Sequence, residues 1–323
     1  LLQRARDLCL SPAAPGMSVL ILGGSGFLGS AAAKHLSAAG LEVKILCRRR
    51  PDAGLFGATP VNIQIADFTA LTATDPLFDG VETVLHFVSS TTPASSMEDM
   101  GFDVSSNLLP TLNLLGIMEE RGIRRLIYAS SGGTVYGVPA RLPAAEDDPT
   151  NPISAHGITK LAIEKFIALH ARLSGLNAII LRVGNPFGPY QLRGVVIGSI
   201  ARFVQLHAAG EQLHIWGDGS VVRDYLHIDD FANALTAIMR DPNFPSGVYN
   251  LASGTGHSLH DILAEIRRVS GRAPAASFEA QRVIDVPAIV LNISRLRQAL
   301  PGWQPRVAFS DGVERMWQFA SSS

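Results

Sequence analysis

Short apolar runs alternate with longer amphipathic stretches over the first 184 residues. The runs predict strands at residues 18–22, 43–47, 61–65, 81–88, 125–130 and 177–183, and the stretches predict helices at 27–39, 102–121 and 153–174. Apolar strands separated by helices are typical of a parallel sheet that helices cover on both sides. With right-handed crossovers, this order predicts an α/β fold with a doubly wound parallel sheet of the Rossmann type.

The pattern changes after Gly184, where the sequence NPFGP at 185–189 interrupts the alternation. A helix at 196–209 and a strand at 247–251 follow, and prolines divide the remaining chain into short helices. We predict a dinucleotide-binding domain of residues 17–184 plus about 221–255. A smaller C-terminal substrate-binding lobe would contain about 185–220 plus 256–323, and residues 1–16 are set apart as an extension, natural or introduced.

Composition excludes several classes of protein. With 47% hydrophobic and 17% charged residues the chain is too apolar for disorder, and a net charge of −1 attracts neither nucleic acid nor an anionic membrane. Two cysteines exclude a disulfide framework and a cysteine-built zinc site, and the histidines show no metal-ligand spacing, so no metal is expected. No apolar run reaches the ~20 residues of a membrane span, and residues 1–16 lack the apolar core of a secretory signal. A cytoplasmic location is therefore expected.

Three glycines, Gly23, Gly26 and Gly29, stand between the first predicted strand and the first predicted helix. Gly23 permits a tight turn, Gly26 lets the backbone approach a pyrophosphate, and Gly29 lets the helix pack on the strand. Backbone N–H groups at the start of the helix, beside Phe27 and Leu28, would then hold the phosphates. The motif predicts a dinucleotide site, with a simple tight turn as the alternative.

The residues after the second and third predicted strands bear on which dinucleotide binds. A carboxylate after the second strand would hold the ribose 2′-hydroxyl of NAD, but the chain has Arg48 at the start of three consecutive arginines. An arginine there suits the 2′-phosphate of NADP, unless these arginines only form a solvated loop. Asp67, after the third strand, is a candidate for the adenine side of the cofactor or for a helix N-cap.

Several motifs then occur along one chain, at 23–29 (GGSGFLG), 86–93 (HFVSSTTP), 130–137 (SSGGTVYG), 156–160 (HGITK), 181–189 (LRVGNPFGP), 216–230 (WGDGSVVRDYLHIDD) and 282–287 (RVIDVP). In this order they resemble the extended short-chain dehydrogenases/reductases, and among these the nucleotide-sugar epimerases/dehydratases of the UDP-glucose 4-epimerase type. The resemblance implies a bound NAD that oxidises the sugar C4 hydroxyl and returns the hydride to the other face, with NADP as the alternative cofactor. It also implies a homodimer formed by the helices at 102–121 and 153–174, whose apolar stripes core packing explains equally well.

The resemblance carries site residues over by position. It implies further cofactor contacts at Phe68, Phe87, Val88, Ser89, Asn107 and Lys160. It implies contacts to a UDP-sugar substrate at Asn185, Trp216, Arg223, Arg282 and Asp285. For the arginines the alternative is a surface ion pair, and for Asn107 it is a plain helix-surface position.

One departure concerns the catalytic base. The family has a tyrosine four residues before the lysine; here Lys160 is present, but the tyrosine position is His156. Imidazole has an unperturbed pKa of ~6.5 and can accept a proton, although Lys160 would lower that value. Three interpretations stay open: an impaired enzyme, a working histidine base, and a protein that only binds cofactor and sugar nucleotide.

The segment after the predicted strand at 125–130 limits the reaction. The family's Ser or Thr position is Gly132 here, so Ser131 and Thr134 are the nearest hydroxyls that could orient the sugar, unless they only cap the backbone. The 4,6-dehydratases of the family carry an Asp-Glu pair here, and the decarboxylases carry a Glu at the place of Thr134. Neither pattern is present, which favours UDP-hexose 4-epimerisation. An NADPH-dependent keto-sugar reductase is the third hypothesis, motivated by Arg48.

Overall fold

The computed structural model describes residues 18–192, 198–280 and 285–322. Its main feature is a seven-stranded sheet in the order β10-β6-β5-β4-β1-β2-β3, in which all neighbours are parallel. The strands are β1 (Ser18–Leu22), β2 (Glu42–Cys47), β3 (Asn62–Ile65), β4 (Thr83–His86), β5 (Arg125–Ser131), β6 (Asn177–Val183) and β10 (Gly247–Leu251). The strand order reverses between β1 and β4, which confirms the predicted doubly wound fold and marks the place where ligands bind in such sheets.

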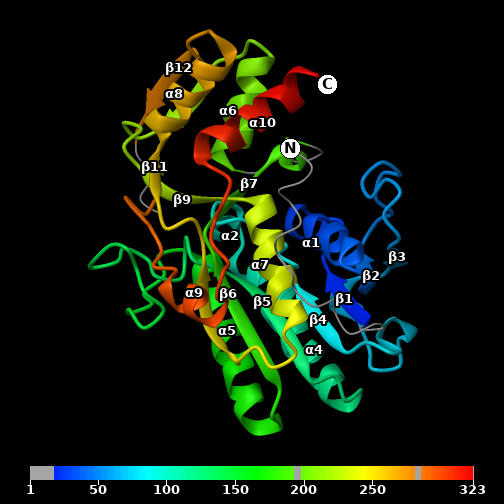
Figure 1. Cartoon of the computed structure of the whole chain (residues 1–323). Coiled ribbons are helices and arrows are strands. Elements are labelled where there is room, and N and C mark those ends of the chain that lie inside the picture. Colours follow the sequence, from blue (N-terminus) through cyan, green and yellow to red (C-terminus); the bar gives the residue numbers. More distant parts are fainter. Residues whose placement is uncertain (1–17, 193–197, 281–284, 323) are drawn as a thin grey trace.

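Helices cover both faces of the sheet, as Figure 1 shows. On one face α1 (Phe27–Ala38) packs against α7 (Ile228–Arg240), and on the other α4 (Leu109–Glu120) packs against α5 (Ala155–Ser174). Successive residues of β1 serve opposite cores: Val19 and Ile21 lie in the core under α1 and α7, whereas Leu20 and Leu22 lie in the core under α4 and α5. Because each strand is buried on both faces, its sequence is apolar without alternation.

The predicted helix at 102–121 is three elements in the structure. A short helix α3 (Met100–Asp103) leads into a π-helical turn, Val104–Leu108, and then into α4. Pro110 has no N–H to donate within the helix, and the Leu109 N–H donates to the carbonyl of Val104 instead. The wider turn places Asn107 inside the protein, 5% exposed, so the helix-surface alternative for this residue is wrong.

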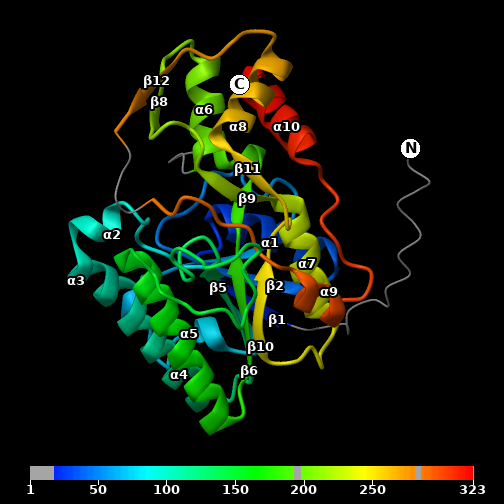
Figure 2. The same cartoon turned by 90° about the vertical axis from the view of Figure 1, so that its left-hand side faces the viewer.

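A second, smaller core lies beyond the carboxyl ends of β6 and β10 (Figure 2). It is built from a three-stranded sheet of β7 (Asn185–Phe187), β9 (Val222–His227) and β11 (Gly256–Ser258), and from the pair β8 (Leu213–Trp216) and β12 (Ala276–Glu279). The helices α6 (Ser199–Ala208), α8 (Leu259–Ser270) and α10 (Phe309–Ser321) pack around it, while α9 (Ser294–Ala299) returns to β10. We propose that this core is the substrate lobe. None of the helices in the described residues is both long and apolar enough to span a membrane.

Candidate active site

The glycine loop joins β1 to α1 at the carboxyl edge of the sheet. Gly23 has a φ of +79°, and its N–H and that of Gly24 both donate to the carbonyl of Leu46 at 3.1 Å. A Cβ on Gly29 would lie 2.2 Å from the Gly23 carbonyl oxygen, so only glycine fits there. Gly26 is the N-cap of α1 and provides no side chain for its free N–H groups, which leaves them to an anion such as a pyrophosphate.

Two cavities meet at this loop and share Gly23, Ser25, Gly26, Phe87 and Ser89. The first, about 380 Å³, also has walls formed by Arg48, Asp67, Phe68 and Val88. The second, about 560 Å³, is also bordered by Phe27, Leu28, Gly29 and Asn185. Most of the cofactor positions named from the sequence therefore border one continuous hollow, whose glycine cradle fits a dinucleotide.

Asp67 and Arg48 lie at the rim of the first cavity. Asp67 Oδ1 accepts the backbone N–H of Thr69 at 2.9 Å and its hydroxyl at 2.8 Å, which lowers the pKa of the carboxyl. Asp67 is thus the N-cap of the short 3₁₀ turn Phe68–Ala70, as one alternative predicts, and it also borders the cavity, where the contact to the adenine side of the cofactor stays a prediction. Arg48 is exposed beside it.

Asn107 holds the loop after β4 in place. Its Oδ1 accepts the backbone N–H of Ser90 at 2.8 Å, and its Nδ2 donates to the carbonyl of Asp103 at 2.9 Å. Ser89 and Ser90 border the first cavity, so Asn107 shapes this wall from behind.

His156 and Lys160 lie one turn apart on α5, which places them on the same face of the helix. Ser154 caps this helix by accepting the Gly157 N–H at 3.2 Å, and the backbone N–H of His156 donates to Ser96 Oγ at 3.0 Å. Lys160 Nζ donates to the carbonyl of Ala129 at 3.0 Å. Both side chains are largely buried, 8% and 7% exposed.

Burial sets the protonation states of this pair. It lowers the pKa of His156 to about 4, with a further lowering from the Lys160 charge, and it lowers the pKa of Lys160 to about 8. At neutral pH His156 is therefore a neutral imidazole that can accept a proton, and Lys160 is a cation. The imidazole is therefore free to accept a proton across the neutral range, and its lowered pKa makes it a weaker base than one that titrates near neutrality.

The two candidate hydroxyls differ in their surroundings. Ser131 ends β5, and its carbonyl accepts the N–H groups of Thr134 and Val135, which closes a turn. A Cβ on Gly157 would lie 3.2 Å from Thr134 Cβ, so Thr134 packs against the first turn of α5 beside His156. The Thr134 hydroxyl oxygen is buried and has no partner among the described residues, whereas a capping role would have given it one.

Gly132 cannot be exchanged for the family's hydroxyl residue without rearrangement. A Cβ there would lie 2.4 Å from Leu291 Cδ1 and 3.1 Å from the carbonyl oxygen of Arg182. We expect Gly132→Ser to lower the free energy of unfolding by about 1–3 kcal/mol, measured by urea denaturation, because the site is overpacked. Gly133→Ser is the matched control, since its Cβ would only reach ordinary contact with Asn185 at 3.5 Å. Equal losses for both variants would contradict this packing.

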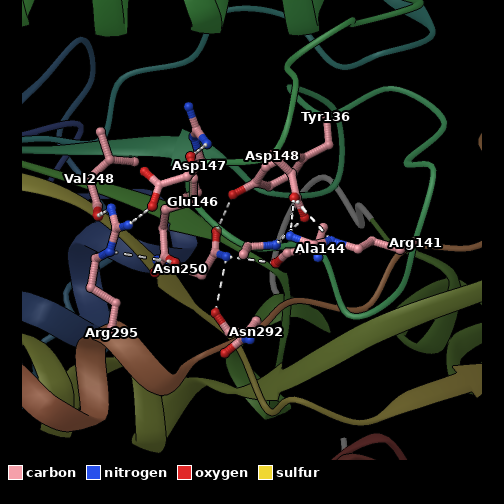
Figure 3. Close-up of polar contacts among 12 residues, drawn as sticks. Tyr136, Arg141, Ala144, Glu146, Asp147, Asp148, Val248, Asn250, Asn292 and Arg295 are labelled. Atoms are coloured by element: carbon pink, nitrogen blue, oxygen red, sulfur yellow. Dashed lines mark hydrogen bonds and ion pairs between the residues drawn. The ribbon is translucent and has the colours of Figure 1, made fainter.

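A polar network, buried at Tyr136, Glu146 and Asn250, holds the segment 136–148, between β5 and α5, against β10 and α9 (Figure 3). Glu146 Oε1 accepts the backbone N–H of Asn250 at 2.9 Å, and Asn250 Oδ1 accepts the Tyr136 hydroxyl at 2.7 Å. Arg295 Nε lies 3.8 Å from Glu146 Oε2, and Arg295 Nη2 forms an ion pair with Asp147 Oδ2. This network fixes the chain between the two parts of the site that carry Thr134 and His156.

The predicted substrate contacts are more dispersed. Asn185, at the start of β7, borders the second cavity, whereas Trp216 ends β8 at an exposed position. Arg223 on β9 donates to the carbonyls of Val222 at 2.9 Å and Val286 at 2.6 Å, and the cavities that meet at the glycine loop do not include it. Asp285 is half-buried, and Arg282 lies outside the described residues.

Some residues at this site could not be predicted from the sequence. Ser96 contacts the His156 backbone and belongs to a polar stretch that resembles a solvated loop. Asp103 is a buried carboxylate that stands at the start of the predicted helix at 102–121, where it resembles a surface residue. Tyr190 and Gln191 border the second cavity but stand after a breaker motif. The described residues contain no group of three or more His, Cys, Asp or Glu that could hold a metal ion.

Comparisons with known proteins agree with this geometry. Residues 19–252 match the NAD dependent epimerase/dehydratase family. The chain is 31% identical over 322 residues to a UDP-glucose 4-epimerase of Corynebacterium glutamicum (95% of this chain, 96% of that protein) and 29% identical over 313 residues to one of Mycolicibacterium smegmatis (94% and 98%).

Solved structures show the same likeness. A UDP-glucose 4-epimerase of Thermus thermophilus in complex with NAD superposes with a TM-score of 0.83 at 30% identity, covering 94% of this chain and 99% of that one. One of Thermotoga maritima with UDP-glucose gives a TM-score of 0.87 at 26% identity, covering 94% and 98%.

Proposed function

Since the chain belongs to the NAD-dependent epimerase/dehydratase family, we propose that it is a UDP-hexose 4-epimerase in which His156 is the catalytic base. The observation that carries the proposal is the His156–Lys160 pair, a neutral imidazole and a buried cation on one face of α5. The family resemblance found in the sequence is confirmed, and NAD is the cofactor. Supporting the substrate class, relatives named UDP-glucose 4-epimerase cover nearly the whole chain.

Different residues of this chain have different roles in the proposed reaction. NAD, when bound, supplies the hydride acceptor and donor, held by the glycine loop and the wall formed by Phe87, Val88 and Ser89. An imidazole nitrogen of His156 takes the proton of the sugar C4 hydroxyl. It returns the proton after the keto sugar has rotated to present its other face. Lys160 holds positive charge beside the reacting oxygen, and the unpartnered Thr134 hydroxyl, with Ser131, orients the sugar.

The sugar nucleotide would lie between the sheet and the smaller lobe. Asn185 reaches this space directly from β7. Arg223 and Arg282 are the proposed diphosphate contacts, since guanidinium binds phosphate oxygens in pairs. Trp216 and Asp285 complete the proposed set. UDP-glucose and UDP-galactose, or their N-acetyl analogues, are the proposed substrates.

The lowered pKa values of His156 and Lys160 predict how the rate of epimerisation depends on pH. His156 is active only when neutral, above about pH 4, and Lys160 only when charged, below about pH 8. We expect kcat/KM for epimerisation to be constant in the interval between these values and to fall on both sides. A coupled assay of UDP-galactose formation across this range measures it. A rate that instead follows one titration at the ordinary histidine value of ~6.5 would contradict the proposed role of His156.

We also propose a homodimer formed through α4 and α5. One face of α5 exposes Ile158, Phe166, Leu169 and Leu173, the last to 76%, and α4 exposes Leu109 beside it. An apolar stripe of this size on paired helices suits a four-helix interface. Leu169→Glu is expected to give a monomer by light scattering, with Arg267→Glu, a change of charge at an exposed position of α8 in the smaller lobe, as the control. A monomeric unmodified protein would overturn the proposal.

A further inference from the structure

Asp103 is a buried carboxylate for which the proposed reaction has so far given no role. It ends α3 and is 1% exposed. Its Oδ1 accepts the Thr91 hydroxyl and, at 3.2 Å, Asn107 Nδ2. Its Oδ2 is buried and has no hydrogen-bond partner among the described residues. Because a buried carboxylate oxygen without a partner is costly, its presence calls for a compensating charge nearby.

That charge is on α5. The helix α3 and the preceding α2 (Ser95–Glu98) pack against α5 (Figure 2), and Ser96 of α2 accepts the backbone N–H of His156 in the first turn of α5. The Asp103 charge raises the pKa of both His156 and Lys160, in opposition to the lowering caused by burial. The charge of the Asp103 carboxylate therefore acts on both members of the pair.

A count of charges shows why the pair needs an anion. When His156 accepts a proton, two cations lie one turn apart on a buried helix face, which is unfavourable. The family's tyrosine would provide its own negative charge as a phenolate, and histidine cannot. The other carboxylate that raises the pKa of Lys160 is Glu164. It is already bound to Arg182 at 2.8 Å and accepts the Ser130 hydroxyl at 2.5 Å.

We propose that Asp103 is a positioning residue whose carboxylate is the counter-ion of the His156–Lys160 pair. It keeps Lys160 protonated and stabilises the imidazolium that forms when the sugar O–H bond breaks and an imidazole N–H bond forms. This proposal rests on the proposed function, because it assigns the anion that a histidine base requires.

The other ionisable groups around the pair do not replace this anion. His86 and Tyr128, on β4 and β5, are buried, and burial disfavours the charged form of each. Glu98 and Asp99, on α2 and at the start of α3, are exposed to solvent, where water screens their charge.

The first test is Asp103→Asn, which keeps the acceptor for Thr91 and Asn107 and removes only the charge. The sequence has four lysines, so the ¹³C signal of Lys160 Cε can be followed in NAD-bound protein grown with labelled lysine. We expect the pKa of Lys160 to fall by about one unit in Asp103→Asn, as for the loss of a close opposite charge. Glu98→Gln removes an exposed carboxylate from the neighbouring helix and should leave it unchanged. An unchanged Lys160 pKa in Asp103→Asn overturns the proposal.

A kinetic comparison distinguishes an electrostatic role of Asp103 from a purely structural one. Asp103→Asn should lower kcat about tenfold with His156 present, as a one-unit loss of pKa implies, and less than about threefold in a His156→Tyr background. Equal losses in both backgrounds would mean a structural role and would overturn the proposal. If no variant makes an epimer, the proposed function fails, while the Lys160 titration still decides the role of Asp103.

A measurement on the unmodified protein covers the case in which Asp103→Asn does not fold. The ¹³C shift of the Asp103 carboxyl, in protein labelled at aspartate, reports its ionisation at pH 7. An ionised carboxyl supports the counter-ion, and a protonated one overturns it.

Discussion

Replacing His156 with alanine is expected to lower kcat for epimerisation by about 10²–10⁴-fold, the usual cost of removing a positioned general base. In the proposed mechanism the neutral imidazole takes the hydroxyl proton, and alanine leaves no acceptor in its place. NAD content should be unchanged, since the glycine loop and the wall after β4 are untouched. Steady-state rates and the NAD released from denatured protein measure both quantities.

The control for this variant is His170→Ala. His170 lies on the same helix, where it faces Glu119 at 3.8 Å, far along α5 from the site. We expect its rate to stay within about twofold of the unmodified protein, as for surface substitutions. An active His156→Ala variant would show that the proton goes elsewhere, and loss in both variants would show damage to the helix.

The second large effect is expected from Gly29→Ala, which should abolish NAD binding. The added Cβ would lie 2.2 Å from the Gly23 carbonyl oxygen and 2.7 Å from Gly24 Cα, so the loop must move away from α1. Because the loop is the proposed phosphate cradle, its displaced backbone N–H groups would no longer meet the cofactor. We also expect the free energy of unfolding to be about 1–3 kcal/mol lower, because the added methyl group overpacks the contact between the loop and α1.

Gly116→Ala is the matched control for Gly29→Ala. Gly116 lies within α4, and a Cβ there meets nothing within 4 Å. This variant should keep its NAD and gain up to about 1 kcal/mol of stability, because alanine is the better helix former. NAD retained by Gly29→Ala, measured by absorbance of the released cofactor, would contradict the placement of the cradle.

The parts of the fold that follow from local patterns could be predicted from the sequence. Residues 18–22, the three glycines and the helix after them form one strand–loop–helix unit, and the structure has these elements at nearly the same bounds. This works because the strand is buried on both faces and the glycines are required by close backbone contacts between neighbours in sequence. The alternation of apolar strands and helices extends the prediction to a doubly wound parallel sheet, without giving the order of its strands.

The helix break before Pro110 does not follow from the sequence, although proline is a clear signal. In the sequence Pro110 fits the first turn of a helix, and only the tertiary position of Asn107 and Asp103 shows that the preceding turn widens. The sequence also does not predict that position 132 must be glycine. The side chain that occupies the space beside it belongs to Leu291, which is 159 residues away in the chain.

The direction of the His156 pKa shift could be predicted from the sequence, but its size could not. The sequence predicts that Lys160 lowers the pKa of His156, but desolvation is the larger cause and carries the value to about 4. Burial depends on α2 and α3, whose polar sequence looks exposed. Asp103 escapes prediction for the same reason, since a carboxylate beside Gly101 and Ser105 resembles a surface residue until its 1% exposure is known.

The most direct test of the central claim is epimer formation by the unmodified chain. The protein with its bound NAD is incubated at pH 7 with UDP-glucose, UDP-galactose and their N-acetyl analogues, and the products are separated by chromatography alongside His156→Tyr. We predict a 4-epimer from at least one pair, without net consumption of NAD or NADPH. No epimer from the unmodified chain while His156→Tyr is active, or steady NADPH consumption with a 4-keto sugar, would contradict the account.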